Sequence, residues 1–515
     1  MTNNISTPVS GKPAIDALLV GRQWGTNVGQ STSLTYSIPQ GTAYWVNNYL
    51  GSEPDTWGAL SQSESDAFRL ALNTWSEVAN IQFTEVADSQ SYGEIRVAFS
   101  QAVTNDPNSA GWAYVPGWDI ESGDIWLDNQ SGGSYLPTSF GFTTFLHEIG
   151  HAIGLAHPFD ANEINGATLT GEEDSSKYTL MSYNDHEGVG YTFIDIGNND
   201  YSWYPVQALG PLLYDIQAIQ YLYGKNTATR SGDDTYTFSN STGEIKAIWD
   251  GGGNDTFDLS NQTLAMNINL NAGEFSSLGV KATWDNGIVL SNATDNIAIA
   301  YDVIIENAIG GQGNDNLIGN IYDNQLTGGQ GDDSLAGGAG TDTAIYQGLF
   351  SEYQIQSQAS NKLTITASSD EGTDTLTDIE WLQFQDQSIN TNTFTNPIPT
   401  SVDEVITTPN EGNENSFNYF LLSIETALLI NASVNYKTID GTANAGEDYL
   451  FTSGIATIEA GKTSTAIAIE IMADTLPEND ESFYLEISNP IGALFPTGQN
   501  TIKVMHTIID DDVFT

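Results

Sequence analysis

One stretch decides the fold of the N-terminal half: Phe145-Leu-His-Glu-Ile-Gly-His-Ala-Ile-Gly-Leu-Ala-His-Pro158. It reads H-E-x-x-H-x-x-G-x-x-H, and it holds three of the five histidines of the chain. His147 and His151 are four residues apart, so on a helix they lie on one face and can share one metal ion. The apolar residues between them predict that the rest of this helix is buried.

The turn after the helix completes the pattern. Gly154 can adopt a left-handed conformation that ends the helix and reverses the chain. His157 can then supply a third imidazole nitrogen, and Glu148 lies where it can reach a metal-bound water. Three imidazoles and one water make an open, catalytic zinc site, whereas a structural zinc site is closed by four protein ligands. The alternative, a helix that carries surface histidines, does not explain the spacing.

The composition excludes several classes of protein. Lys and Arg number 13 against 66 Asp and Glu, which gives a formal charge of −53. Such a chain repels nucleic acid and anionic membranes. The 11 Trp, 23 Tyr and 20 Phe are enough for packed cores, so the excess carboxylates indicate bound calcium more than disorder. No Cys is present, which excludes disulfides and a thiolate inhibitory switch.

Periodicity around the histidine stretch predicts an α/β domain with a mixed sheet. Residues 61–78 have the periodicity of an amphipathic helix, with Phe68, Leu72 and Trp75 on one face. Short alternating runs before the histidine stretch predict strands, and Pro116 makes 111–116 an edge strand. We expect a substrate to pair antiparallel with this strand near Trp112, Ala113 and Tyr114. A second amphipathic helix is predicted at 206–224.

A second motif lies 24 residues after His157, in Leu180-Met-Ser-Tyr183. A histidine stretch of this form followed by a Met-turn resembles the metzincin pattern, and Pro158 with Tyr183 narrows the resemblance to serralysin-type (RTX) metalloproteases. The resemblance implies that Met181 forms an apolar floor beneath the zinc. It also implies that Tyr183 is an extra zinc ligand that moves away to stabilise the transition state. His186 has no motif support and is interpreted as a surface residue.

Gly-rich acidic turns occur after residue 230. Three copies of G-G-x-G-x-D begin at Gly310, Gly328 and Gly337, which are 18 and 9 residues apart. A nine-residue period of this kind is typical of the parallel β-roll, in which stacked turns bind Ca²⁺ between them. The turn at 318–326 departs from the pattern, which puts calcium there in doubt. The candidate calcium ligands in this region are Arg230, Gly232, Asp234, Asp250, Gly252, Gly253, Asp255, Glu306, Gly311, Gly313, Asp315, Gly329, Gly331, Asp333, Gly338, Gly340 and Asp342.

The last segment, 401–512, resembles a Calx-beta domain, an immunoglobulin-like sandwich with calcium at one end. The resemblance rests on the stretches 436–449, 478–487 and 508–512. It suggests Glu404, Asp448, Asp480, Asp510 and Asp511 as calcium ligands, against the alternative of solvated acidic loops.

These features divide the chain into consecutive parts. Residues 1–17 are expected to be a flexible N-terminus or prosegment, without the features of a Sec-type signal peptide. A protease domain at 18–230, an RTX β-roll at 231–345 and a small β module at 346–395 follow. A linker at 396–400 then leads to a Calx-beta-like sandwich at 401–515, whose end resembles a type I secretion signal.

The resulting hypothesis is a secreted, monomeric zinc endopeptidase that is stabilised by several calcium ions and acts on proteins or peptides. Glu148 is the general base, and Tyr183 stabilises the oxyanion. One alternative is a calcium-dependent extracellular adhesin with a vestigial protease domain, which the intact Glu148 disfavours. Another is a zinc hydrolase acting on non-peptide substrates, which the Met-turn and Tyr183 disfavour. Neither substrate identity nor cleavage specificity follows from the sequence.

Overall fold

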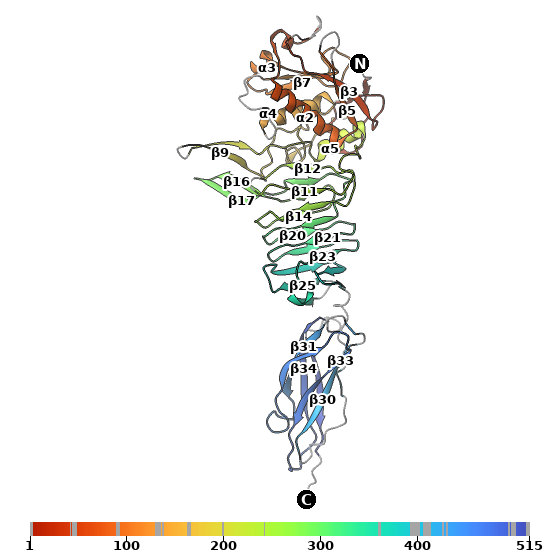
Figure 1. The fold of residues 1–515 in the computed structure, drawn as a ribbon, viewed down its shortest axis with the longest axis vertical. Coiled ribbons are helices and arrows are strands. Elements are labelled where there is room, and N and C mark those ends of the chain that lie inside the picture. The colour runs from red at the N-terminus through yellow and green to blue at the C-terminus, as the bar shows by residue number, and fades with distance from the viewer. Residues whose placement is uncertain are drawn as a thin grey trace. The chain divides into compact units, whose positions relative to one another are not determined.

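The computed structural model describes residues 4–510 except 42, 44–48, 89–92, 129–134, 136–138, 162–165, 198–199, 241–242, 359–361, 392–401, 405–413, 425–426, 429–430, 493–494 and 496–500. It divides into two compact units, Met1–Asn320 and Ile321–Thr515. The first unit therefore contains the predicted protease domain together with much of the Gly-rich region (Figure 1). Within the described residues, no helix has the length and apolarity needed to cross a membrane.

A mixed sheet forms the core of the first unit, as the periodicity predicts. Its strand order is β5-β3-β6-β8-β7. Neighbouring strands are parallel except at the edge, where β7 runs antiparallel to β8. The strands are β3 (Thr32–Ser37), β5 (Ile81–Glu85), β6 (Ile95–Ser100), β7 (Gly111–Ala113) and β8 (Asp124–Leu127), and β4 (Trp57–Gly58) pairs with β6.

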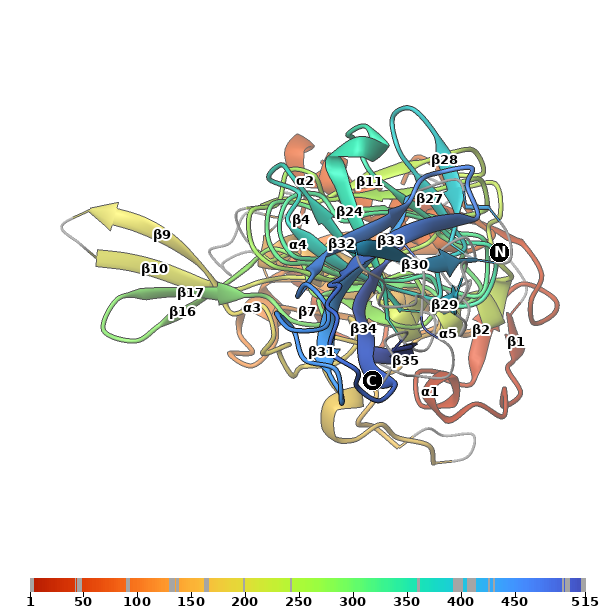
Figure 2. The same cartoon turned by 90° about the horizontal axis from the view of Figure 1, so that it is seen from below.

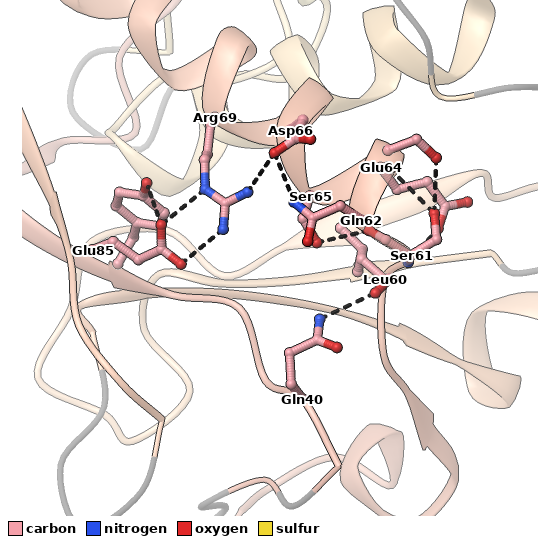
Figure 3. A network of polar contacts seen from close by, with 11 residues as sticks. Gln40, Leu60, Ser61, Gln62, Glu64, Ser65, Asp66, Arg69 and Glu85 are labelled. Carbon is pink, nitrogen blue, oxygen red and sulfur yellow. Dashed lines mark hydrogen bonds and ion pairs between the residues drawn. The ribbon is translucent and has the colours of Figure 1, made fainter.

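The predicted amphipathic helix is α2 (Gln62–Val78), and it begins with a capping box between Ser61 and Glu64. Arg69 on this helix donates to Glu85 of β5 through two nitrogens, at 2.8 and 2.9 Å, and so ties the helix to the sheet (Figure 3). On the buried face, Trp75 Nε1 donates to the carbonyl of Leu146 at 3.1 Å. Because Leu146 lies in α4 (Phe140–Ala152), this bond fixes the histidine helix against α2.

The helix predicted at 206–224 is shorter than expected. It begins at Leu213 and ends at Tyr223, as α5. Pro211 disfavours helical geometry at the preceding residue, and Asp215 accepts a hydrogen bond from the Leu212 backbone nitrogen at 2.9 Å, which starts the helix there. The other helical segments of this unit are α1 (Pro13–Asp16), α3 (Gln101–Thr104), η1 (Glu53–Thr56) and η2 (Gly171–Glu173).

The N-terminal residues differ from the expectation of a flexible segment. Strand β1 (Asn4–Ser6) pairs antiparallel with β2 (Arg22–Trp24), and Asp16 is buried and accepts from the backbone nitrogen of Ser10 at 2.6 Å. Composition alone did not indicate this, because the pairing partner lies outside the polar segment.

Short parallel strands occupy the C-terminal part of the first unit. β11 (Thr235–Thr237), β13 (Thr256–Asp258) and β19 (Asn307–Ile309) form one ladder, and β14 (Asn267–Asn269) and β20 (Asn316–Ile318) form another. The central residue of each three-residue strand is buried, for example Phe257 and Leu317. A further small sheet contains β12 (Lys246–Ile248), β18 (Ile297–Ile299) and β15 (Phe275–Ser276).

Two hairpins project together from this unit in both views (Figures 1 and 2). They are β9 (Tyr191–Gly197) with β10 (Asp200–Pro205), and β16 (Val280–Trp284) with β17 (Ile288–Asn292). The ring centroids of Phe193 and Trp284 lie 5.9 Å apart, so aromatic contacts join the hairpins although the sequence separates them widely.

The second unit begins with the same type of short strand. β21 (Gln325–Thr327), β23 (Thr343–Ile345) and β27 (Trp381–Gln383) are parallel neighbours, and β28 (Ser388–Asn390) pairs antiparallel with β27. β22 (Ser334–Ala336) is parallel to β26 (Thr373–Thr377). β26 pairs antiparallel with β25 (Lys362–Ala367), and β25 pairs antiparallel with β24 (Tyr353–Gln358). Strands of the small β module predicted at 346–395 therefore extend the ladders of the repeats, and η3 (Phe350–Glu352) directly precedes β24.

The C-terminal part of the second unit contains two antiparallel sheets. One is β29 (Val402–Glu404), β30 (Ser416–Ser423) and β33 (Ser464–Ile471), and the other is β32 (Ser453–Ile458), β31 (Ala432–Asp440), β34 (Glu481–Ile491) and β35 (Thr501–Ile508). Buried residues alternate along β30 and β34, and Phe420 packs on Phe483 with centroids 6.2 Å apart. One apolar core thus joins the two sheets.

Candidate active site

The three histidines of the decisive stretch converge on one point. The Nε2 atoms of His147, His151 and His157 are 3.0 to 3.3 Å from one another. Nitrogens about 2.0–2.1 Å from a tetrahedral zinc ion lie about 3.3–3.4 Å apart. The donor set therefore fits zinc, with the fourth position left for water or substrate.

Local structure explains why these nitrogens meet. His147 and His151 lie one turn apart on α4, and Gly154, at φ +117°, reverses the chain towards His157. A Cβ atom at Gly154 would lie 2.9 Å from the carbonyl oxygen of Arg22, so both the backbone angle and the packing require glycine.

Hydrogen bonds at the opposite ring nitrogens fix the imidazoles. Nδ1 of His147 lies 2.8 Å from the carbonyl of Leu180, and Nδ1 of His151 lies 2.8 Å from that of Leu155. A carbonyl can only accept, so each Nδ1 carries the proton and each Nε2 offers its lone pair to a metal. The third ring is held by a carboxylate, because His157 Nδ1 lies 3.0 Å from Asp160 Oδ2.

Burial keeps the first two imidazoles neutral. It lowers the pKa of His147 to about 4 and that of His151 well below its usual value, against an opposing effect of the carbonyl acceptors. A metal therefore competes with no proton for these rings near neutral pH.

Glu148 is the buried acid of the site. Its side chain is 5% exposed, and Oε2 has no hydrogen-bond partner. Burial raises the pKa of this carboxyl to about 8, which makes it a proton acceptor of unusual basicity when ionised. A Cβ atom at Gly111 of β7 would lie 3.2 Å from Glu148 Cγ, so the edge strand passes directly beside this acid.

The two residues of the second motif take different places. Met181 is fully buried, and a Cβ atom at Gly150 of α4 would lie 2.8 Å from its sulfur, so Met181 packs against the helix between the two histidines. Tyr183 is 68% exposed, and its hydroxyl lies 2.8 Å from His157 Nε2. His186, which sequence analysis left outside the site, is half-buried and contacts the carbonyl of Thr294.

The edge strand predicted at 111–116 is present as β7, at the edge of the mixed sheet. Trp112 Nε1 and the Tyr114 hydroxyl both donate to Glu53 Oε1, at 3.1 and 2.9 Å. These two side chains therefore project to the same side of the strand and are fixed there. Sequence reasoning missed Glu53, because its role depends on a contact across 59 residues.

The predicted calcium residues of the first unit include one cluster. Carboxylate oxygens of Asp234, Asp250 and Asp255 lie within 4.8 Å of one another, and the backbone nitrogen of Asp255 donates to Glu306 at 2.8 Å. The backbone oxygen of Gly232 packs so closely on Gly253 that a side chain there would collide with it. Further along, the backbone nitrogen of Gly311 donates to Asp315 at 2.7 Å. Gly313 packs on the backbone of Leu264 and Ala265. Two other predicted calcium residues of this unit have positive φ angles, Arg230 at +48° and Gly252 at +118°.

In the second unit each repeat aspartate meets an acid from a later turn. The backbone nitrogens of Asp333 and Asp342 donate to Asp374 at 3.0 Å and to Glu380 at 2.8 Å, and Oδ2 of Asp342 is buried without a hydrogen-bond partner. Sequence analysis missed Asp374 and Glu380 because they lie outside the repeat. Gly329, Gly331, Gly338 and Gly340 all have positive φ, between +100° and +131°.

The C-terminal acidic cluster differs from the predicted set. Carboxylate oxygens of Asp448, Glu478 and Glu481 lie within 4.8 Å of one another, and Asp510 accepts from the Glu478 backbone at 2.7 Å. Asp480 is exposed and lies outside this cluster. Glu478 and Glu481, which the sequence analysis did not select, take its place in the cluster. Asp511 and the side chain of Glu404 lie outside the described residues.

A mixed sheet, an H-E-x-x-H helix with a third histidine after the turn, and a buried methionine below define a metzincin-type domain. Comparison with known families supports this. Residues 50–193 match the matrixin family, 213–450 match the peptidase M10 serralysin C-terminal family, and 413–512 match the Calx-beta domain. The chain is thus multidomain, and its resemblance to serralysins with an added Calx-beta region is confirmed.

Several curated relatives are similar to about half of this chain or more. The serralysin of Proteus mirabilis is 36% identical over 325 residues, which are 57% of this chain and 60% of the relative. The metallopeptidase AprA of Pseudomonas marginalis is 39% identical over 274 residues, 49% of this chain and 53% of the relative. The chain spans about three fifths of the length of such relatives.

Solved structures of Calx calcium-binding domains are similar to about a fifth of the chain. The apo form of the Calx CBD1 domain is 31% identical, with 20% of this chain and 89% of that chain covered and a TM-score of 0.17. The calcium-binding domain CBD12 of CALX1.1 is 30% identical over 21% of this chain and 43% of that chain, with a TM-score of 0.18.

Proposed function

We propose that this protein is a secreted zinc endopeptidase stabilised by calcium. The observation that carries the proposal is the convergence of three imidazole nitrogens within 3.3 Å of one another, beside a buried glutamate whose Oε2 has no hydrogen-bond partner. Names of the relatives, serralysin and metallopeptidase, support a peptidase over an adhesin.

Zinc bound by His147, His151 and His157 would lower the pKa of a coordinated water and polarise a carbonyl group. Glu148 takes the proton of the attacking water and passes it to the leaving amine, because its carboxyl is dry and basic. Tyr183 carries its hydroxyl 2.8 Å from a zinc ligand and donates to the developing oxyanion. The free edge of β7 pairs with the substrate backbone at Trp112, Ala113 and Tyr114.

The Gly-rich strands support a calcium-bound β-roll. Along the chain, β19 and β20 join different ladders in the first unit, and β21, β22 and β23 alternate between two ladders in the second. We assign calcium to the turns between them, at the repeat aspartates and glycines described above. Three carboxylates that lie outside the glycine-rich repeats, those of Glu306, Asp374 and Glu380, would complete these sites.

The division into a protease domain (18–230), a roll (231–345), a closing module (346–395) and a Calx-beta-like sandwich (401–515) is kept as part of the proposal. The two antiparallel sheets with a common core support the sandwich. Asp448, Glu478, Glu481 and Asp510 are proposed as its calcium ligands. We also propose that a type I system exports the protein, because calcium sites of this kind fill only where calcium is abundant, outside the cell. The protein is proposed to act as a monomer.

Hydrolysis of casein by the full chain tests the proposal. We expect cleavage by the wild type, loss of cleavage with a zinc chelator, and recovery when zinc is added back. Glu148→Ala should bind zinc, measured by metal analysis, and should be inactive. Activity that survives this substitution contradicts the mechanism, and a zinc-loaded wild type without activity favours the adhesin.

A further inference from the structure

A cavity of about 490 Å³ lies next to the candidate zinc site in the first unit. Residues after the edge strand β7 form one wall, from Tyr114 to Gly117, and residues after the third histidine form another, including Ala156 and Asp160. The segment Leu19–Arg22 contributes the remaining side. Since Asp160 holds the ring of His157, the cavity opens beside the reaction centre.

Carboxylates dominate the charge of this cavity. Asp119, Glu121 and Asp160 line it, against the single guanidinium of Arg22. Glu121 is only 5% exposed, and its Oε2 has no hydrogen-bond partner. A buried carboxylate oxygen without a donor costs free energy, so a ligand that supplies a donor is favoured at this position.

The direction of a substrate along β7 tells which of its residues reach the cavity. Gly111 lies beside Glu148, so the reacting bond is level with the beginning of β7. A substrate that pairs antiparallel with β7 runs in the opposite direction to this strand. Substrate residues closer to its N-terminus therefore lie closer to Tyr114 and Gly117. At about 3.3 Å per residue, the cavity meets side chains a few residues upstream of the cleaved bond.

We infer that this cavity is a specificity subsite for a basic side chain, lysine or arginine, upstream of the cleaved bond, and that Glu121 is its charge partner. An ammonium or guanidinium group in the cavity provides the opposite charge that the carboxylate of Glu121 lacks, and its charge is opposite to the net charge of the lining. The inference rests on the proposed peptidase function and specifies its substrate class.

Paired fluorogenic peptides test the subsite in the full, zinc- and calcium-loaded chain. The two members of a pair are identical except for lysine or norleucine at one of the five positions upstream of the cleaved bond, and mass spectrometry locates the cleavage. At one or two positions the wild type should prefer lysine, measured as the ratio of kcat/KM values. Glu121→Gln should lower that ratio about tenfold, the size of one charge-assisted hydrogen bond. Asp106→Asn, an exposed carboxylate outside the cavity, should keep it.

A second pair of variants covers the case in which Glu121→Gln does not fold. Val115 is 38% exposed and lines the cavity, so Val115→Lys places a competing ammonium group there without removing a buried group. It should lower the lysine preference relative to Val115→Gln. Equal cleavage of both peptides by the wild type, or an unchanged ratio in the variants, overturns the subsite alone. Failure of the wild type to cleave any peptide overturns the peptidase function as well.

Discussion

The histidine site and the acidic turns both gather metal ligands, but they do so with opposite electrostatics. Three imidazoles approach within 3.3 Å, and burial, followed for His151 by the neighbouring histidines, lowers the pKa of His147 and His151, so that these two rings are neutral. In the turns, carboxylates raise one another's pKa in addition to the effect of burial, as Asp250 and Glu306 do for Asp255. We therefore expect the histidine site to form before its ion binds, and the acidic turns to be stabilised by an ion that neutralises their carboxylates.

The surroundings of the two sites follow from this difference. Backbone carbonyls of Leu180 and Leu155 hold the rings of His147 and His151, so packing of the protein positions the ligands. The carboxylates of the turns are held by backbone nitrogens of neighbouring turns, as Glu306 is by Asp255. Zinc should therefore serve chemistry more than folding, and calcium should serve folding more than chemistry.

Removal of each metal gives the largest expected effect. Calcium chelation should lower the thermal midpoint by more than about 10 °C and should change the far-ultraviolet circular dichroism, because several ions are linked to folding. Zinc chelation should shift the midpoint far less while it abolishes proteolysis. Calorimetry of the full chain with each chelator, and with each ion restored, measures both. Equal shifts would remove the distinction between the sites.

Glycine-to-alanine substitutions compare how tightly the acidic turns and the histidine helix are packed. A Cβ atom at Gly337 collides with the backbone oxygen of Asp378 and with Asp342, so Gly337→Ala requires a turn to move. A Cβ atom at Gly150 meets mainly the flexible side chain of Met181, at 2.8 Å. We expect losses of about 3 kcal/mol for Gly337→Ala and about 1 kcal/mol for Gly150→Ala, within the range for overpacking. Denaturant unfolding of the calcium-loaded chain checks the order, and the reverse order would contradict it.

The pH dependence of the calcium-free protein tests the repulsion. Burial, followed by neighbouring carboxylates, raises the pKa of Asp255 and Asp374 to about 7, whereas unfolded aspartate has a value of about 3.9. Between about pH 4 and 7 the folded state therefore binds more protons than the unfolded state, and stability falls as pH rises. Thermal midpoints in EGTA should decrease across this window. Saturating calcium should remove the trend, and a trend of the opposite sign would show that repulsion is not the cause.

A smaller effect is expected at the third histidine. Its ring is held by Asp160, which is 65% exposed, and not by a buried carbonyl. Asp160→Asn should weaken zinc binding by about tenfold, the low end for an outer hydrogen-bond partner of a metal ligand. Competition with a zinc-sensitive dye measures the affinity directly. A loss as large as that caused by His157→Ala would mean that Asp160 does more than orient the ring.

The sequence by itself determined the features that depend on short-range spacing. Positions 147, 151 and 157 specify a metal site because a helix period and one glycine turn bring them together, and the nine-residue repeat specifies stacked turns for the same reason. The core helices could also be predicted from periodicity, apart from the first residues of the helix at 206–224, where Pro211 delays its start.

Only the tertiary structure decided the features that depend on distant contacts. The contact of Glu53 with Trp112 and Tyr114, the carbonyl of Leu180 behind His147, and the cavity that contains Glu121 join residues far apart in the chain. Likewise, Glu478 and Glu481, and not Asp480, face Asp448, because side-chain direction at a strand end depends on pairing and register. No local pattern records such contacts, since they form only when packed elements meet.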